Sequence, residues 1–119
     1  MTLFRAKNKS GKWVYGIPLN FEDGKTRMIK AGKGNNVSKV EIVPETIGQF
    51  TGAYDAHNNM IYEGDIVKDA IGVIHTVIYD QCKYGILSNF PQKEGHIIPE
   101  VIVVGNDYDQ PELGLSEEL

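Results

Sequence analysis

The side chains with the greatest capacity for chemistry lie close together in the middle of the chain. Asp55, His57, Glu63 and Asp65 fall within one short polar stretch. Carboxylates and an imidazole at this spacing could bind a metal ion or act as an acid–base pair. The same acids also suit a structural role, because an Asp in a turn accepts hydrogen bonds from the turn amides. Asp65 directly precedes the apolar residues 66–67, as in a turn that enters a strand, and we therefore predict that these acids are structural.

The other titratable residues form no recognisable site. His57, His75 and His96 lie too far apart for a helical metal-binding pair, and we expect His75 to be a hydrogen-bonded residue of the core or its rim. A calcium-binding loop starting at Asp107 would need Gly at its sixth position, where Glu112 stands. We therefore predict no catalytic residue, no metal site and no cofactor, and we expect that the protein is not an enzyme.

The cysteine count and the lengths of the apolar runs bear on the compartment. The chain has one cysteine, Cys82, so no internal disulfide can form. Residues 1–11 contain no apolar run typical of a signal peptide. The longest aliphatic run, Val101–Val104, is far shorter than the ~20 residues needed to cross a bilayer. We therefore expect a cytoplasmic protein with no membrane partner.

Charge is divided unevenly along the chain. Residues 1–40 carry nine bases and two acids, a net charge of +7, whereas residues 41–119 carry three bases and fourteen acids, a net charge of −11. Such asymmetry favours an interaction with another molecule. Two interpretations remain open, because the opposite charges could meet between subunits or neutralise each other within one subunit. The candidate interaction surface consists of the N-terminal bases and one aromatic residue: Arg5, Lys7, Lys9, Lys12, Trp13, Lys30 and Lys33.

Large apolar residues alternate along the N-terminal part of the chain. Trp13, Tyr15, Ile17, Leu19 and Phe21 occupy every second position, which is typical of a strand with one buried face. Aromatic rings among bases could instead stack on nucleotides. We favour the buried face, because the alternation places the rings on the apolar side of the strand. Nucleic-acid binding is therefore an alternative that the sequence does not favour.

The pattern of short strands and turns predicts the fold class. No segment keeps a helical period beyond about two turns, and Pro44 suits the start of a single helical turn. The sequence predicts a mainly-β single domain, a small barrel with an N-terminal hairpin lobe and at most short helical turns. The Gly- and Asn-rich residues 31–36 are the expected division. The predicted parts are a basic hairpin lobe at 1–36, a β-barrel at 37–113 and a flexible tail at 114–119.

Several segments together are similar to one known family. The most specific are PETIGQFTG at 44–52 and IYEGDIV at 61–67. The other similar segments follow the same order along the chain: FRA at 4–6, WVYG at 13–16, VIYD at 77–80, GN at 105–106 and DYDQPEL at 107–113. Over nearly the whole chain this pattern resembles the YopX family of small phage and prophage proteins. The family's usual glycine is missing from the turn at 56–59, where we expect Asn59 to take the positive φ.

The resemblance implies an SH3-like barrel, assembly into a homo-oligomer, and a phage or prophage origin, but it implies no established activity. We therefore predict a non-enzymatic, self-assembling protein-interaction module in the cytoplasm of a bacterial host. Its expected partners are other copies of itself and an unidentified phage or host protein. The first alternative is a nucleic-acid-binding accessory protein that uses the basic N-terminal lobe. The second is an enzyme whose site is shared between subunits.

Overall fold

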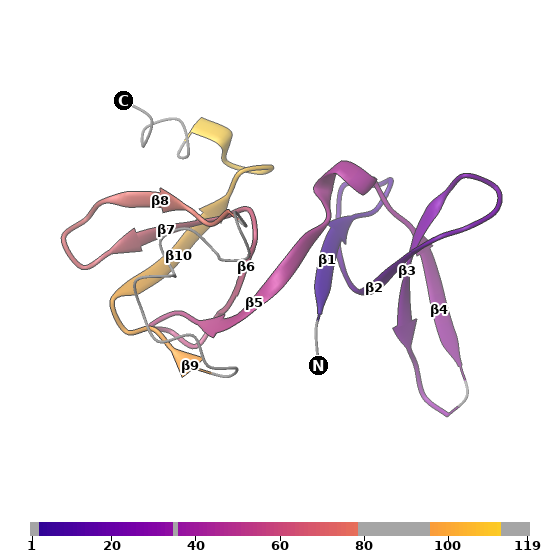
Figure 1. Cartoon of the computed structure of the whole chain (residues 1–119), viewed down its shortest axis with the longest axis horizontal. Helices are drawn as coiled ribbons and strands as arrows, with labels where there is room; N and C mark the ends of the chain where they lie inside the picture. The colour runs from indigo at the N-terminus through magenta and orange to yellow at the C-terminus, as the bar shows by residue number, and fades with distance from the viewer. Residues whose placement is uncertain (1–2, 35, 79–95, 113–119) are drawn as a thin grey trace. The chain divides into compact units, whose positions relative to one another are not determined.

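The computed structural model describes residues 3–34, 36–78 and 96–112. The prediction of a mainly-β protein is confirmed, since strands alternate with short turns along the described chain (Figure 1). The chain divides into two compact units, unit 1 at Met1–Gln49 and unit 2 at Phe50–Leu119. The division therefore lies after residue 49, and not in the Gly- and Asn-rich segment where we expected it.

Unit 1 is built around an antiparallel sheet in the order β4-β3-β2-β1-β5. One face carries a small core of Ala6, Met28 and Ile42, against which Val14 and Ile47 pack. Neighbouring positions along the chain explain the order from β4 to β1, because short turns join antiparallel strands. The start of β5 then pairs with the other edge of β1. The elements are β1 (Phe4–Lys7), β2 (Trp13–Asn20), β3 (Thr26–Ala31), β4 (Val37–Glu41), the 3₁₀ turn η1 (Pro44–Thr46) and the first residues of β5 (Gly48–Tyr54).

Residues 31–34 and 36 belong to a hairpin inside unit 1. The amide of Gly32 donates a hydrogen bond to the carbonyl of Asn36 at 2.8 Å, and the register of β3 and β4 continues from Ala31 opposite Val37. The conformational freedom of Gly in this segment therefore serves a tight turn rather than a linker. The sequence could not distinguish these two uses.

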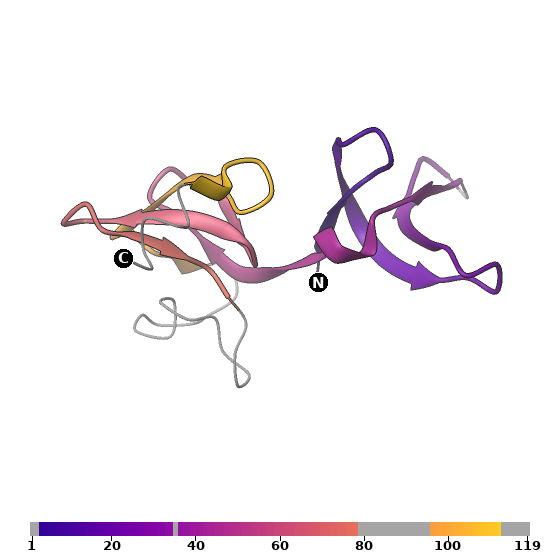
Figure 2. The same cartoon turned by 90° about the horizontal axis from the view of Figure 1, so that it is seen from above.

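Strand β2 belongs to two pairings at once. Residues 13–16 pair with β1, whereas residues 17–20 pair with β3. At the junction Gly16 has a φ of +154°, and a Cβ built there would collide with the backbone carbonyl of Ile29. Only glycine allows this close approach. In the second view β2, β3 and β4 lie side by side as a curled sheet (Figure 2).

Unit 2 contains the rest of β5 and a three-stranded sheet in the order β10-β7-β8. Strand β5 pairs with β6 in antiparallel and with β9 in parallel orientation. Apolar side chains from these strands and their connections form its core: Ala53, Ile61, Val67, Val77, Ile98 and Val101. The strands are β6 (Met60–Tyr62), β7 (Asp65–Asp69), β8 (Ile74–Thr76), β9 (His96–Ile97) and β10 (Val101–Asn106).

The expected SH3-like barrel is not confirmed. The sheets that the described residues form are open and do not close into a barrel. Closure needs a fixed tilt and stagger of the strands, and alternating short apolar runs fit open and closed sheets equally well. The expected tail at 114–119 lies outside the described residues.

Two local predictions have clear outcomes. The single helical turn expected after Pro44 is present as η1 (Pro44–Thr46), which starts at that proline. The turn at 56–59 does contain an asparagine with positive φ, but it is Asn58, at +65°, and not Asn59. The side chain of Asn59 instead donates a hydrogen bond to Asp55. No helix in the part of the chain that the structure describes is long and apolar enough to cross a membrane.

Candidate interaction surface

Three of the predicted surface residues meet where β1 lies beside β2. The guanidinium carbon of Arg5 lies 4.5 Å from the centre of the Trp13 ring, and the ammonium of Lys7 lies 5.4 Å from it. The strand register creates this cluster, because Lys7 is opposite Trp13 and Arg5 is opposite Tyr15. Arg5 is only 7% exposed. The Trp13 ring therefore already has two cationic neighbours, an arrangement typical of cation–π contact.

Trp13 also forms part of a groove that Lys30 helps to line. The groove has a volume of about 210 Å³ and crosses β2, β3 and β4. Val14 and Met28, which belong to the core of unit 1, form part of its apolar floor. The groove could not be predicted from the sequence, because its lining residues come from three strands. Its lining residues are Trp13, Val14, Tyr15, Met28, Lys30, Ser38 and Val40.

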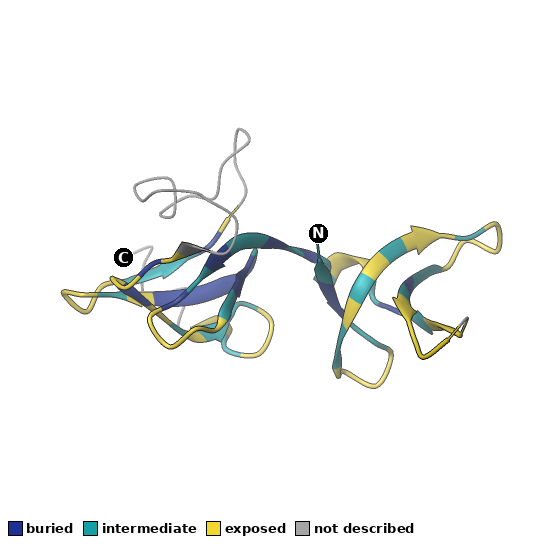
Figure 3. Ribbon diagram, turned by 90° about the horizontal axis from the view of Figure 1, so that it is seen from below, coloured by how far each residue is buried: buried dark blue, intermediate teal, exposed yellow. Residues whose placement is uncertain are grey.

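The opposite face of this sheet is apolar and exposed. Ile17 and Leu19 are each 51% exposed, and Val37 on β4 is 55% exposed. The alternation of exposed and half-buried residues along β2 is visible in Figure 3. The prediction that these positions of β2 form a buried face is wrong. The alternation correctly indicated that Ile17 and Leu19 share one face, but the core of unit 1 lies on the other face, with Met28.

Charged residues border this exposed face. The register places Ile17, Ile29 and Lys39 in one row across the sheet, and Leu19, Arg27 and Glu41 in the next row. We call this side of β2, β3 and β4 the outer face. Its residues occupy the positions between those whose side chains face the core of unit 1. Its members are Ile17, Leu19, Arg27, Ile29, Val37, Lys39 and Glu41.

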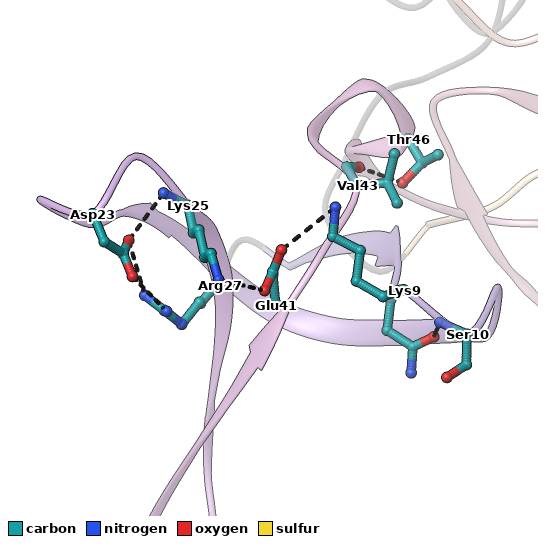
Figure 4. Close-up of polar contacts among 9 residues, drawn as sticks. Lys9, Ser10, Asp23, Lys25, Arg27, Glu41, Val43 and Thr46 are labelled. Carbon is teal, nitrogen blue, oxygen red and sulfur yellow. Dashed lines mark hydrogen bonds and ion pairs between the residues drawn. The ribbon is translucent and has the colours of Figure 1, made fainter.

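The remaining predicted surface residues do not form one patch. Lys9 makes an ion pair with Glu41 at 3.4 Å, and Lys25 pairs with the other oxygen of the same carboxylate at 3.7 Å (Figure 4). Lys12 and Lys33 are exposed residues of two different hairpin turns. Glu41 therefore offsets part of the positive charge near Lys9.

The turn between β2 and β3 has its own ion pair. The Arg27 guanidinium donates to Asp23 at 2.7 Å (Figure 4). This hydrogen bond, followed by one from the amide of Lys25, holds the pKa of Asp23 below its ordinary value. The guanidinium of Arg27 also lies 4.6 Å from the ring centre of Phe21. Arg27 is thereby fixed at the border of the outer face.

The division of charge follows the two structural units. Unit 1, residues 1–49, has nine bases and four acids, a net charge of +5. Unit 2, residues 50–119, has three bases and twelve acids, a net charge of −9. The sequence asymmetry is therefore an asymmetry between two compact bodies.

Asp55 and Asp65 bond to backbone amides, as predicted from their turn context. Asp55 is buried and accepts hydrogen bonds from the amides of His57 at 2.9 Å, Asn59 at 2.8 Å and Val103 at 2.9 Å. Burial would raise the pKa of Asp55, but the bonds from Val103, Asn59 and His57 outweigh it and lower the pKa. In the same way, Asp65 accepts a bond from the amide of Tyr62 at 2.8 Å.

His75 has the hydrogen bond that we predicted for it. Its Nε2 lies 2.9 Å from Oδ2 of Asp69, and both side chains are largely buried. The other oxygen of Asp69 accepts bonds from the amides of Ile71 and Val73 in the β7–β8 turn. The bond with His75, followed by that from Val73, lowers the pKa of Asp69. Sequence reasoning missed Asp69 as the partner, although an Asp three residues before Gly72 indicated a turn.

Among the residues that the structure describes, no three His, Cys, Asp or Glu side chains lie close enough together to hold a metal ion. Asp55, Asp65 and Asp69 accept hydrogen bonds from backbone amides, and the ring of His75 is bonded to Asp69. Cys82 and the side chain of His96 lie outside the described residues. The described part of unit 1 carries a groove and an exposed apolar sheet face, and another molecule could bind to either surface.

Comparison with known proteins agrees with the resemblance seen in the sequence. The model of the YopX protein family matches residues 3–113. The crystal structure of protein EF1440 from Enterococcus faecalis is similar, with a TM-score of 0.59 and 23% sequence identity, over 96% of this chain and 98% of that one. At this identity the likeness concerns the fold. No curated protein matches the sequence. Because the family match covers nearly the whole chain, this protein belongs to the YopX family.

Proposed function

We propose that this chain is a non-enzymatic protein-interaction module of phage or prophage origin that self-associates in the cytoplasm of its bacterial host. Membership of the YopX family supports the origin. The observation that carries the proposal is the segregation of charge between the two units, +5 in unit 1 and −9 in unit 2. A folded body with one strongly basic and one strongly acidic unit is complementary to a second copy of itself.

The outer face of unit 1 supplies the apolar part of such a contact. Ile17, Leu19 and Val37 expose apolar surface beside Arg27 and Lys39. Charge pairs at the rim of an interface accelerate and orient association, while apolar area at its centre supplies most of the free energy. A basic surface of one copy against an acidic surface of the next is a heterologous contact, which closes into a ring or extends into a filament.

Self-association through opposite charges is expected to weaken with salt. The Debye length falls from about 10 Å at 0.1 M to about 3 Å at 1 M ionic strength. Light scattering at constant protein concentration should therefore show a mean mass that decreases along this salt series. A mass that stays above that of one chain and does not decrease along the series would contradict electrostatic docking, and a single-chain mass throughout would contradict self-association.

The apolar part of the contact has a separate test. Replacing Ile17 and Leu19 together by Ser is expected to reduce the mean mass to that of one chain at 0.1 M salt, because their apolar area would no longer be buried between copies. The matched control is Ile71→Ser. Ile71 is 85% exposed at the tip of the β7–β8 turn, outside the outer face. The control variant should assemble like the unaltered protein.

Nucleic-acid binding through unit 1 has less support. Exposed Tyr15 could stack on a base, but the rings of Trp13 and Phe21 already have cationic neighbours at 4.5 and 4.6 Å. The net negative charge of the whole chain also opposes binding to a polyanion. Fluorescence anisotropy with labelled single-stranded DNA at low salt measures this directly, and the proposed function predicts no change in anisotropy.

A further inference from the structure

Strand β4 has one open edge. Among the described residues β4 pairs only with β3. The amide of Ile42 donates to the carbonyl of Thr26, and antiparallel strands alternate between pairs that exchange hydrogen bonds and pairs that do not. This alternation assigns Val40 and Ser38 to bonded pairs with β3. The backbone groups of Val37 and Lys39 consequently point away from β3, toward the open edge.

The groove adjoins the same strand. Ser38 and Val40 contribute two of its lining side chains, next to Met28, Lys30 and Trp13. A further strand added along β4 would place every second side chain on this side of the sheet, directly beside Ser38 and Val40. The groove volume of about 210 Å³ suits one or two apolar side chains rather than a whole small-molecule ligand.

Positive charge surrounds the open edge. Lys30, Lys33 and Lys39 are all exposed, and none of them has an ion pair with a described residue. Like charges directly opposite each other on adjacent strands are destabilising. Pairing of this edge with the same edge of a second copy would bring these lysines together, so the edge disfavours its own copy. An acidic strand would instead be attracted.

We propose that the open edge of β4, together with the adjacent groove, binds an extended acidic peptide segment of another protein by strand addition. The backbone of the peptide pairs with Val37 and Lys39, and an apolar side chain enters the groove beside Val40. The alternate side chains of the peptide lie on the other side of the sheet, where carboxylates meet Lys39. Main-chain hydrogen bonds supply affinity in this mode of recognition, and the side-chain pocket supplies specificity. This site shares Val37 and Lys39 with the outer face, but it uses their outward backbone groups and the adjacent groove, and it goes beyond self-association.

Trp13 provides the readout, because it is the only tryptophan of the chain and lines the groove. The probe is a short, end-capped peptide of alternating Glu and Val residues, titrated into the full chain at 0.1 M salt. The expected result is a saturable change of Trp fluorescence. A peptide with Lys in place of Glu should bind at least tenfold more weakly. Equal binding of the two peptides, or no saturable change with the Glu peptide, would overturn the proposal.

Two substitutions at one position separate charge from backbone pairing. Lys39→Ala removes the charge and keeps the outward N–H, and we expect binding about threefold weaker. Lys39→Pro removes both the charge and the outward N–H, and it leaves the hydrogen bonds between β4 and β3 intact. Proline is tolerated on an edge strand where the N–H points away from the sheet. We expect it to weaken binding at least tenfold. Equal affinities of the two variants would exclude strand addition. Lys68→Glu, at the exposed position of β7 in unit 2, is the control and should bind like the unaltered protein.

A third probe keeps the proposal testable if Lys39→Pro does not fold, as judged by circular dichroism. The Glu peptide with N-methyl groups on alternate residues lacks the hydrogen-bond donors that strand addition needs, and it should bind at least tenfold more weakly than its unmethylated parent. Undiminished binding of the methylated peptides in both registers would overturn the proposal. Light scattering on the same samples reports self-association independently, so failure of one proposal is distinguishable from failure of the other.

Discussion

Replacing Asp55 by Asn is expected to lower the free energy of unfolding by about 3 kcal/mol. Asp55 is buried, and its two oxygens accept four hydrogen bonds, three from amides and one from the side chain of Asn59. The bond from Val103 joins residues 48 positions apart in the sequence. The NH₂ group of an asparagine would face these donors, and a buried donor without an acceptor costs about 1–3 kcal/mol.

Urea denaturation followed by circular dichroism measures this loss. Glu63→Gln is the matched control, because it removes a carboxylate from the same stretch of chain at a position with no hydrogen bond or ion pair to the described residues. We expect it to change the free energy of unfolding by less than about 0.5 kcal/mol. A loss below about 1 kcal/mol for Asp55→Asn would show that the carboxylate does not organise unit 2.

The same carboxylate predicts how stability depends on pH. The pKa of Asp55 is lowered from 3.8 in the folded protein, because the hydrogen bonds to its charged form outweigh the effect of burial. Its contribution is therefore complete above the ordinary pKa and is lost as the pH falls through the lower folded value. In the Asn variant this part of the acid destabilisation should be absent, so the difference in unfolding free energy between the two proteins should decrease below about pH 4.

Replacing Gly16 by Ala is expected to destabilise unit 1 by at least about 2 kcal/mol. The backbone of Gly16 has a φ of +154°, and an added Cβ would collide with the carbonyl of Ile29. Because that carbonyl belongs to the backbone of β3, the strand itself would have to move. The contact between β2 and β3 supports both the groove and the outer face, so the variant should also bind the peptide probe more weakly.

Gly11→Ala is the control variant, because it places a Cβ on a residue with positive φ where the Cβ meets no other atom. Gly11 has a φ of +82°, and nothing lies within 4 Å of a Cβ placed there. Its cost should be limited to the backbone strain of about 1 kcal/mol. If urea denaturation shows the same loss in free energy of unfolding for both substitutions, the collision with the Ile29 carbonyl does not account for the effect at Gly16.

The sequence alone determined the features that depend on neighbouring residues. The mainly-β class, the turn that starts at Pro44 and the turn-bonding role of Asp65 follow from local patterns, because strand alternation and turn chemistry act over a few residues. The family followed from PETIGQFTG and IYEGDIV, which occur in one order at fixed places. The charge asymmetry is a property of the residue order itself, and the two units of the structure carry net charges of opposite sign.

Only the tertiary structure decided what depends on contacts between distant segments. The alternation along β2 could not show which of its faces has a covering layer, and the structure leaves Ile17 and Leu19 exposed. The sequence also could not predict three further features. These are the open sheets in place of a barrel, the division after residue 49, and the groove lined by Trp13 and Lys30. The physical reason is that these features depend on which strands pair and where the core collects, and one pattern of short alternating strands is compatible with several such arrangements.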